Sequence, residues 1–332
     1  MTFLRSFYAL DCFCCRLFCR GVNAQPWQNI DPASAGWSLD KLKAAQDYAT
    51  SLKPTAVMVV QDGKVIASWG DVSRKVNVAS VCKSLLSAIY GIAVGERRID
   101  LGSTLADFGI DDKCPALTAT ERRATIRDLL MARSGVYQVA AYETADIRYK
   151  RPVRLARSGS TTTGISALSA RSTGSRPAKI FSRASRSASP CRSAWRISQC
   201  ATAAIRSKAR LFIRPTFHHE RPRSRRFGQL FLNGGKWDGQ QVIPAAWVGE
   251  STTALSQPSE HNSGYGYMWW TLRTDQWWPG SVFNAGYGGQ VVAYVPEKRL
   301  VVVQTVDPHQ NRRGIDMRDF FQLMRKIAAA AP

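Results

Sequence analysis

Residues 77–91 read NVASVCKSLLSAIYG, and in this stretch Ser80 and Lys83 stand immediately before an apolar run. The run is rich in Leu, Ile and Ala and predicts a helix over residues 80–95. Positions three apart lie on one face of a helix, so the two side chains are expected within contact range. Either Ser80 caps the helix and Lys83 lies on its solvent face, or Lys83 stands over the hydroxyl and takes its proton.

The second interpretation has definite chemical requirements. A serine hydroxyl is a weak nucleophile until a base removes its proton. A lysine can be that base only when it is neutral, which requires burial or nearby positive charge. Free N–H groups at a helix N-terminus favour a developing oxyanion. The spacing alone is not specific, because Ser38 and Lys41 share it, and there it predicts only the cap of a helix over residues 38–52.

Two β-hairpins are expected at opposite ends of the chain. Residues 55–70 alternate in polarity and break at Asp62-Gly63, a strong short hairpin signal. Residues 290–306 form two β-rich runs around Pro296-Glu297-Lys298, and a helix over 315–330 follows. We therefore predict an α+β fold in which an antiparallel sheet, built from both chain ends and flanked by helices, receives an inserted helical region.

The charge of the chain is unevenly distributed. The 332 residues carry a formal net charge of +22, which would normally suggest nucleic acid or an anionic surface as partner. Residues 151–225, however, hold 15 Arg, 2 Lys and a single acid, Glu220, and the rest of the chain is only weakly basic. Hydrophobic residues make up 45% of the sequence, enough for a core, and no run is long enough for a membrane span. No nucleic-acid partner is expected.

The first 24 residues resemble a degenerate signal peptide. They have an early arginine and an apolar, cysteine-rich middle that Asp11 and Arg16 interrupt. If this segment works as a signal, the protein is periplasmic or secreted, and otherwise it is cytoplasmic. The eight cysteines form neither a disulfide framework nor a zinc-ligand spacing.

Several blocks together resemble a known family of enzymes. NVASVCKSLLSAIYGIAV (77–94), IDLGSTLADFGI (99–110) and TIRDLLMARSGV (125–136) are followed by RFGQLFLNGGKWDGQQVIPAAWV (226–248) and GYGYMWW (264–270). In order and spacing they resemble the serine hydrolases related to class C β-lactamases, penicillin-binding D-Ala-D-Ala peptidases, type VIII esterases and 6-aminohexanoate-dimer hydrolases. The resemblance implies one β-lactamase/transpeptidase-like domain over 25–332, with an α/β part at 38–99 and 226–332 and a helical region at 100–225.

The resemblance also implies roles for individual residues. Ser80 would be the nucleophile and Lys83 its base, and they would cleave a small ester or amide through an acyl-enzyme without a cofactor or metal. The stretch FNAGYGGQ (283–290) matches the element that lies beside the serine in this family. The N–H groups of Tyr287 and Ser80 would form the oxyanion hole. The substrate-binding residues would be Asn284, Gly286, Gly288 and Gln290.

This element lacks the lysine or histidine that the family usually has there. The box reads Asn284-Ala285-Gly286, which weakens any site for a β-lactam carboxylate. A GYGGQ sequence instead resembles the dimer-hydrolase and esterase side of the family. The tryptophans nearby, Trp269, Trp270, Trp277 and Trp278, fit an apolar acyl pocket and a hydrophobic core equally well.

One family motif is missing. Members carry Tyr-x-Asn or Ser-x-Asn in the helical region, but this chain has no Tyr between Tyr149 and Tyr265 and no Asn between Asn77 and Asn233. Residues 151–225 contain 14 Ser beside the 15 Arg and no Asp, as a GC-rich gene read in the wrong frame would. Codons for residues 159–166, regrouped by one base, can read Trp-Phe-Tyr-Asn-Asn-Trp-Asp-Phe. We hypothesise that this segment is frameshifted and that turnover is impaired.

Two other functions stay open. The missing motif is compatible with a non-catalytic relative of the penicillin-binding scaffold. The Arg/Ser-rich run at 151–225 is compatible with a basic protein that binds nucleic acid or another anion. A hydrolase of the nucleophile-elbow type is not supported, because no Gly-x-Ser-x-Gly is present. The sequence identifies neither the substrate nor the oligomeric state.

Overall fold

The computed structural model describes residues 27–111, 116–136, 223–257 and 263–332. The possible signal peptide at 1–24 lies outside the described residues. So does the hypothetical frameshifted segment, except for its last three residues, which begin a helix.

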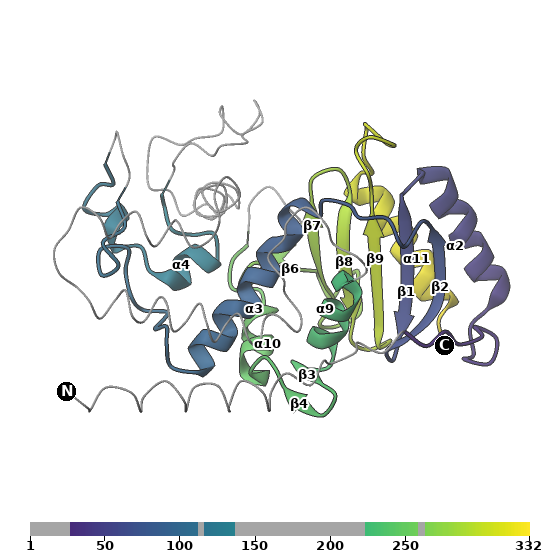
Figure 1. The fold of residues 1–332 in the computed structure, drawn as a ribbon, viewed down its shortest axis with the longest axis horizontal. Coiled ribbons are helices and arrows are strands. Elements are labelled where there is room, and N and C mark those ends of the chain that lie inside the picture. Colours follow the sequence, from purple (N-terminus) through teal and green to yellow (C-terminus); the bar gives the residue numbers. More distant parts are fainter. Residues whose placement is uncertain (1–26, 112–115, 137–222, 258–262) are drawn as a thin grey trace, which may run out of the picture.

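A seven-stranded antiparallel sheet joins the two ends of the chain (Figure 1), in the order β2-β1-β9-β8-β7-β6-β5. The long strands are β1 (Ala56–Gln61), β2 (Lys64–Gly70), β7 (Val282–Gly286), β8 (Gln290–Val295) and β9 (Leu300–Thr305), and the short ones are β5 (Gly264–Tyr265) and β6 (Trp270–Thr271). The N-terminal hairpin meets the C-terminal strands where β1 pairs with β9, with Ala56 opposite Thr305. The predicted α+β sheet built from both chain ends is confirmed.

Local sequence explains both hairpins. Asp62 and Gly63 have φ angles of 49° and 76°, and two successive positive φ angles are what a tight turn between twisted strands requires. The β8–β9 turn closes with a hydrogen bond of 2.9 Å from the Arg299 N–H to the Pro296 carbonyl. Both predicted hairpins are therefore present.

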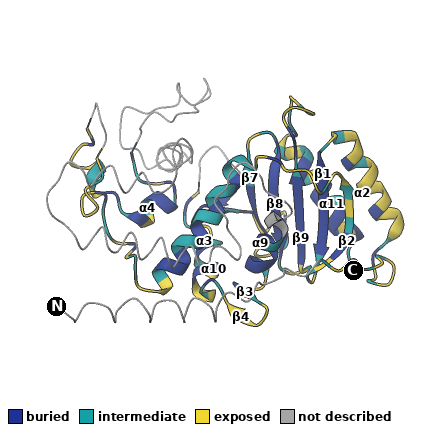
Figure 2. Cartoon of the chain, viewed as in Figure 1, coloured by how far each residue is buried: buried dark blue, intermediate teal, exposed yellow. Residues whose placement is uncertain are grey.

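Two helices from opposite chain ends cover one face of the sheet. α2 (Leu39–Leu52) and α11 (Met317–Ala330) pack together over it, and their buried side chains share a core cluster with strand residues such as Val59 and Phe283. The Ser38 hydroxyl accepts a hydrogen bond from the Lys41 N–H, so the predicted helix cap at Ser38 is confirmed. Figure 2 shows that the outer side of α2 is exposed, whereas the central strands are buried.

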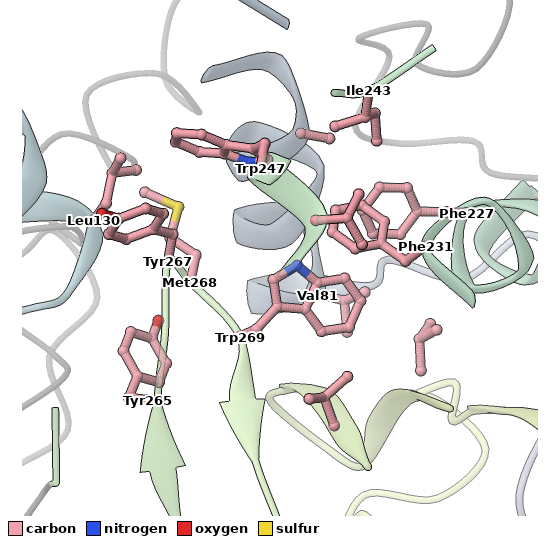
Figure 3. Packing of buried hydrophobic residues seen from close by; sticks show 14 of the residues in the cluster. Val81, Leu130, Phe227, Phe231, Ile243, Trp247, Tyr265, Tyr267, Met268 and Trp269 are labelled. Atoms are coloured by element: carbon pink, nitrogen blue, oxygen red, sulfur yellow. The ribbon is translucent and has the colours of Figure 1, made fainter. Parts of the chain in front are cut away.

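The opposite face of the sheet is covered by α3 (Cys82–Gly95), α9 (Arg223–Leu232) and α10 (Ala245–Ser251). Trp269 is fully buried there and stacks on Phe227 with ring centroids 5.8 Å apart (Figure 3). Trp277 is buried on the other face against Phe321. Trp270 and Trp278 pack against the same clusters, which favours the core interpretation of all four tryptophans.

A short helix attaches the described part of the helical region to the rest of the fold. α4 (Ile126–Leu130) begins with a capping box in which Thr125 and Asp128 bond each other's backbone N–H groups. Arg127 on this helix bonds Glu250 and the Tyr267 hydroxyl, and thereby ties α4 to α10.

The remaining described elements are the 3-10 turns η1 (Ala79–Val81) and η2 (Glu121–Arg123) and the small pair β3 (Lys236–Trp237) and β4 (Gln240–Gln241). None of the helices in the described ranges is long and apolar enough to span a bilayer.

Candidate active site

Ser80 lies in a 3-10 turn rather than in the first turn of the helix. The turn η1 immediately precedes α3, so the predicted helix start at residue 80 is two residues too early. We call residues 78–81 the Ser80 turn. Ala79 has φ = 48°, a left-handed conformation that non-glycine residues rarely adopt, and its N–H donates to the Asn77 side-chain oxygen at 2.9 Å. The residue before the candidate nucleophile is therefore held in a strained conformation.

The core fixes the other end of this turn. Val81 is 2% exposed and belongs to the cluster that contains Trp269 and Phe231 (Figure 3). One turn further along α3, the hydroxyl of the buried Ser84 donates to the Met268 carbonyl at 2.7 Å. Because the side chains of Val81 and Ser84 are both buried in the protein, the partly buried Ser80 has little freedom to move relative to the sheet.

Lys83 lies in the first turn of α3 and is partly buried. Burial lowers the pKa of its amine, because the charged form loses hydration. Among the described residues, no carboxylate pairs with this amine. The shift is in the direction that a proton acceptor needs, since it increases the neutral fraction of Lys83 at a given pH. Cys82 beside it is a free thiol, and burial raises its pKa, which favours packing over reactivity.

Strand β7 approaches the Ser80 turn at the point where β7 no longer pairs with β6. β6 pairs only with Val282 and Phe283, so the rest of β7 continues beyond β6 while still pairing with β8. A Cβ atom built on Gly286 would lie 2.3 Å from the Val78 carbonyl oxygen and 3.1 Å from the Ser80 nitrogen. Only glycine fits this contact. The end of β7 is therefore packed against the backbone of the candidate nucleophile, and Tyr287 is the next residue.

Asn284 faces the same side of the sheet as Gly286, since side chains alternate along a strand. It is 3% exposed, and its side-chain NH₂ group has no hydrogen-bond partner among the described residues. A buried donor without a partner costs free energy, and such groups are rare in folded proteins. The predicted contact between Asn284 and the substrate stays a prediction, but its donor is free to make one.

The three-residue loop 287–289 connects β7 to β8. Gly288 and Gly289 have φ angles of 84° and 95°, which is why glycines are needed there, and the Tyr287 side chain is 81% exposed. Gln290 is buried, and both ends of its side-chain amide bond the backbone of Val306. Its side chain therefore holds the start of β8 in place, and the predicted substrate contact of Gln290 stays a prediction.

Gln304 is a further residue beside the candidate site that was not predicted from the sequence. This β9 residue is 1% exposed, and its side-chain nitrogen donates to the Gly289 carbonyl at 2.9 Å. The available signal was a polar residue inside the run VVVQTV, but the sequence does not say what lies opposite it. Within the described ranges, no three His, Cys, Asp or Glu side chains are grouped as metal ligands would be.

No protein-family model matches the chain, and no curated protein matches it in sequence. Solved structures do match it. A Bacillus anthracis protein assigned as a 6-aminohexanoate-dimer hydrolase is 16% identical, with a TM-score of 0.57, and the match covers 92% of this chain and 86% of that one. A family VIII carboxylesterase is 13% identical, with a TM-score of 0.54 and coverage of 92% and 99%. A class C β-lactamase of Rhodobacter sphaeroides is 14% identical, with a TM-score of 0.52 and coverage of 87% and 99%.

These likenesses define the fold. The chain has the α+β fold of the β-lactamase and penicillin-binding-protein-like serine hydrolases, a group whose members include esterases, amidases and β-lactamases. The resemblance and the fold class predicted from the sequence are confirmed. The identities are too low to transfer a substrate or a catalytic residue from any of these proteins to this chain.

Proposed function

We propose that this chain is a serine hydrolase that cleaves a small ester or amide through an acyl-enzyme. The Ser80 hydroxyl attacks the carbonyl carbon while the neutral amine of Lys83 takes its proton. The N–H groups of Ser80 and Tyr287 stabilise the oxyanion. The carbon–heteroatom bond then breaks, the proton passes from Lys83 to the leaving group, and water hydrolyses the acyl-enzyme.

The observation that supports this proposal best is the contact at Gly286. Because the end of β7 packs against the Ser80 nitrogen, the backbone of the residue after Gly286 begins beside the candidate nucleophile. Two backbone N–H groups held on separate segments would form a pre-organised oxyanion hole, and removing one such donor typically costs about 10²–10³ in rate. The lowered pKa of the Lys83 amine supplies the second requirement.

The missing Tyr-x-Asn motif should affect substrates unequally. We propose that its loss slows proton transfer to the leaving group, because Lys83 must then carry the proton without the motif's tyrosine. A p-nitrophenolate leaves without being protonated, whereas an amine must gain a proton before its bond to carbon breaks. Activated esters are therefore expected to acylate Ser80 while amides react poorly. On a frame-repaired chain, nitrocefin, p-nitrophenyl butyrate and an aminohexanoate dimer would compare the substrate classes.

The frameshift proposal has its own test, independent of any assay. Sequencing the DNA that encodes residues 150–226 should reveal insertions or deletions that restore a Tyr-x-Asn reading. An intact open frame with ordinary codon usage would refute it, and the Arg/Ser-rich run would then be a genuine part of the protein.

A fluorophosphonate probe tests the catalytic proposal directly, because it reacts with activated serine hydroxyls and needs no leaving-group protonation. Labelling should be found on Ser80 and be abolished by Ser80→Ala and by Lys83→Ala. Ser38→Ala and Lys41→Ala are matched controls, since they alter the same Ser-x-x-Lys spacing at a helix cap. They should leave labelling unchanged.

Other outcomes would favour the alternatives. A folded chain that the probe does not label would contradict the hydrolase and support the non-catalytic scaffold. Salt-dependent binding to nucleic acid that is lost when residues 151–225 are deleted would support the anion-binding protein instead.

A further inference from the structure

The loop 287–289 needs restraint from outside itself. It consists of an exposed tyrosine and two glycines in left-handed conformations, and glycines lose more conformational freedom on ordering than any other residue. Within the loop, the Gly289 N–H bonds the Gly286 carbonyl at 3.2 Å. This single bond leaves the two peptide carbonyls of Gly288 and Gly289 to be fixed by other parts of the fold.

Both carbonyls have partners from distant segments. The Gly288 carbonyl accepts from the Ile315 N–H at 3.3 Å, and the Gly289 carbonyl accepts from the Gln304 side chain at 2.9 Å. The segment before α11 also presses on the loop, since a Cβ atom on Gly314 would lie 2.9 Å from the Gly288 oxygen. The bond from Gln304 is the one that a side-chain substitution can remove without moving the backbone.

Only one of the two polar atoms in the Gln304 side-chain amide makes a hydrogen bond to the described residues. Its nitrogen donates to the Gly289 carbonyl, while its oxygen is buried and has no partner within the part of the chain that the structure describes. A methionine would keep the approximate shape and remove the unpaired oxygen, so stability alone does not require glutamine at this position. What methionine lacks is the donor to the loop.

We propose that Gln304 is a positioning residue for the oxyanion hole. By fixing the Gly289 carbonyl, it holds the loop so that the Tyr287 N–H is directed to the point that the Ser80 N–H also faces. The inference rests on the proposed function, because it assigns Gln304 a role in the same reaction. Gln304 itself lies behind the loop in the core and does not touch the substrate.

The test compares Gln304→Met with the full-length wild-type chain. The second-order rate of fluorophosphonate labelling at Ser80 should fall about 10-fold or more, and kcat for p-nitrophenyl butyrate should fall with little change in KM, since part of one oxyanion donor's effect is lost. The melting temperature should change little, because removing the unpaired Gln304 oxygen offsets the loss of its bond to Gly289. Backbone amide exchange in residues 287–290 should become faster, which a purely structural role elsewhere in the core would not cause.

Gln61→Met is the matched control. Gln61 also lies in the sheet, and its side-chain nitrogen also donates to a turn carbonyl, that of Lys298 at 3.2 Å, but this turn joins β8 to β9 at the other end of the strands. Gln61→Met also removes the acceptor of the Trp37 indole N–H, so it should lower stability, and it should leave the labelling rate unchanged.

Three outcomes would overturn the inference. The first is an unchanged labelling rate in Gln304→Met, the second is unchanged exchange in the loop, and the third is a rate loss explained entirely by a smaller folded fraction. If the wild-type chain is not labelled at all, the proposed function fails, and the exchange measurement alone still decides whether Gln304 fixes the loop.

Discussion

Replacing Gly286 by alanine tests whether the contact between β7 and the Ser80 turn forms the site. The added methyl carbon would lie 2.3 Å from the Val78 carbonyl oxygen, and an ordinary van der Waals separation is about 3.4 Å or more. The two backbones must therefore separate by about 1 Å. Neither can yield easily, because Val81 anchors the turn in the core and β8 pairs with the strand.

The expected effects on stability and on rate are similar in free energy but are measured separately. Overpacking of this kind costs about 1–3 kcal/mol of folding free energy. A displacement of about 1 Å between reacting groups can cost about 10²-fold in rate, which corresponds to about 2.7 kcal/mol of activation free energy. Gly286→Ala should therefore label with the fluorophosphonate probe about 100-fold more slowly than wild type. It should still unfold cooperatively in urea.

Two control variants separate this effect from general damage. Gly235→Ala introduces an equally severe backbone clash, 2.1 Å from the Ile243 carbonyl oxygen, beside the small pair β3 and β4. It should lose stability but keep its labelling rate per folded molecule. Gly249→Ala has open space around the new methyl group, lies in α10 and should be neutral or slightly stabilising. A wild-type labelling rate in folded Gly286→Ala would refute the idea that this close approach sets the geometry of the site.

Two further predictions concern Lys83 and Tyr267. Because burial lowers the Lys83 pKa and the neutral amine is the proton acceptor, the labelling rate should rise with pH and level off below the ordinary lysine value of about 10.4. Lys83→Arg, which stays charged, should lose this rise, and a pH profile that it shares with wild type would contradict the assignment. Tyr267→Phe removes a buried hydroxyl that donates to Glu250 and accepts from Arg127, and should cost about 1 kcal/mol in urea unfolding without changing the labelling rate per folded molecule. An unchanged urea midpoint would show that this link between α4 and α10 does not stabilise the fold.

Most elements of the fold could be predicted from local patterns. The Asp62-Gly63 turn, the cap at Ser38 and the β-rich runs on either side of Pro296 all depend on interactions between residues close in sequence. The boundary at Ser80 could not be placed in this way. The left-handed Ala79 and the 3-10 turn after it are compatible with the sequence but not favoured by it, and contacts with β7 and the core hold them in place.

In the candidate site too, some features follow from residues close in sequence and others only from contacts between distant segments. Ser80 and Lys83 are three residues apart, so the spacing in the sequence is enough to predict that they lie near each other. The neighbours of the loop after Gly286 come from β9 and from the segment before α11, and no spacing in the sequence predicts that Gln304 meets Gly289. The strands must likewise be assembled before one sees that the Asn284 NH₂ group has no partner in the described ranges and that both ends of the Gln290 amide are bonded.

By itself, the sequence determined the Ser-x-x-Lys spacing, the hairpins and the caps, because the turn preferences and hydrogen bonds that form them act over a few residues. The assembled tertiary structure was needed to show that β7 extends beyond β6 and meets the Ser80 turn at Gly286. It was also needed to show that burial lowers the pKa of Lys83. Close packing and desolvation depend on atoms that are distant along the chain, and these exist as neighbours only once the sheet has formed.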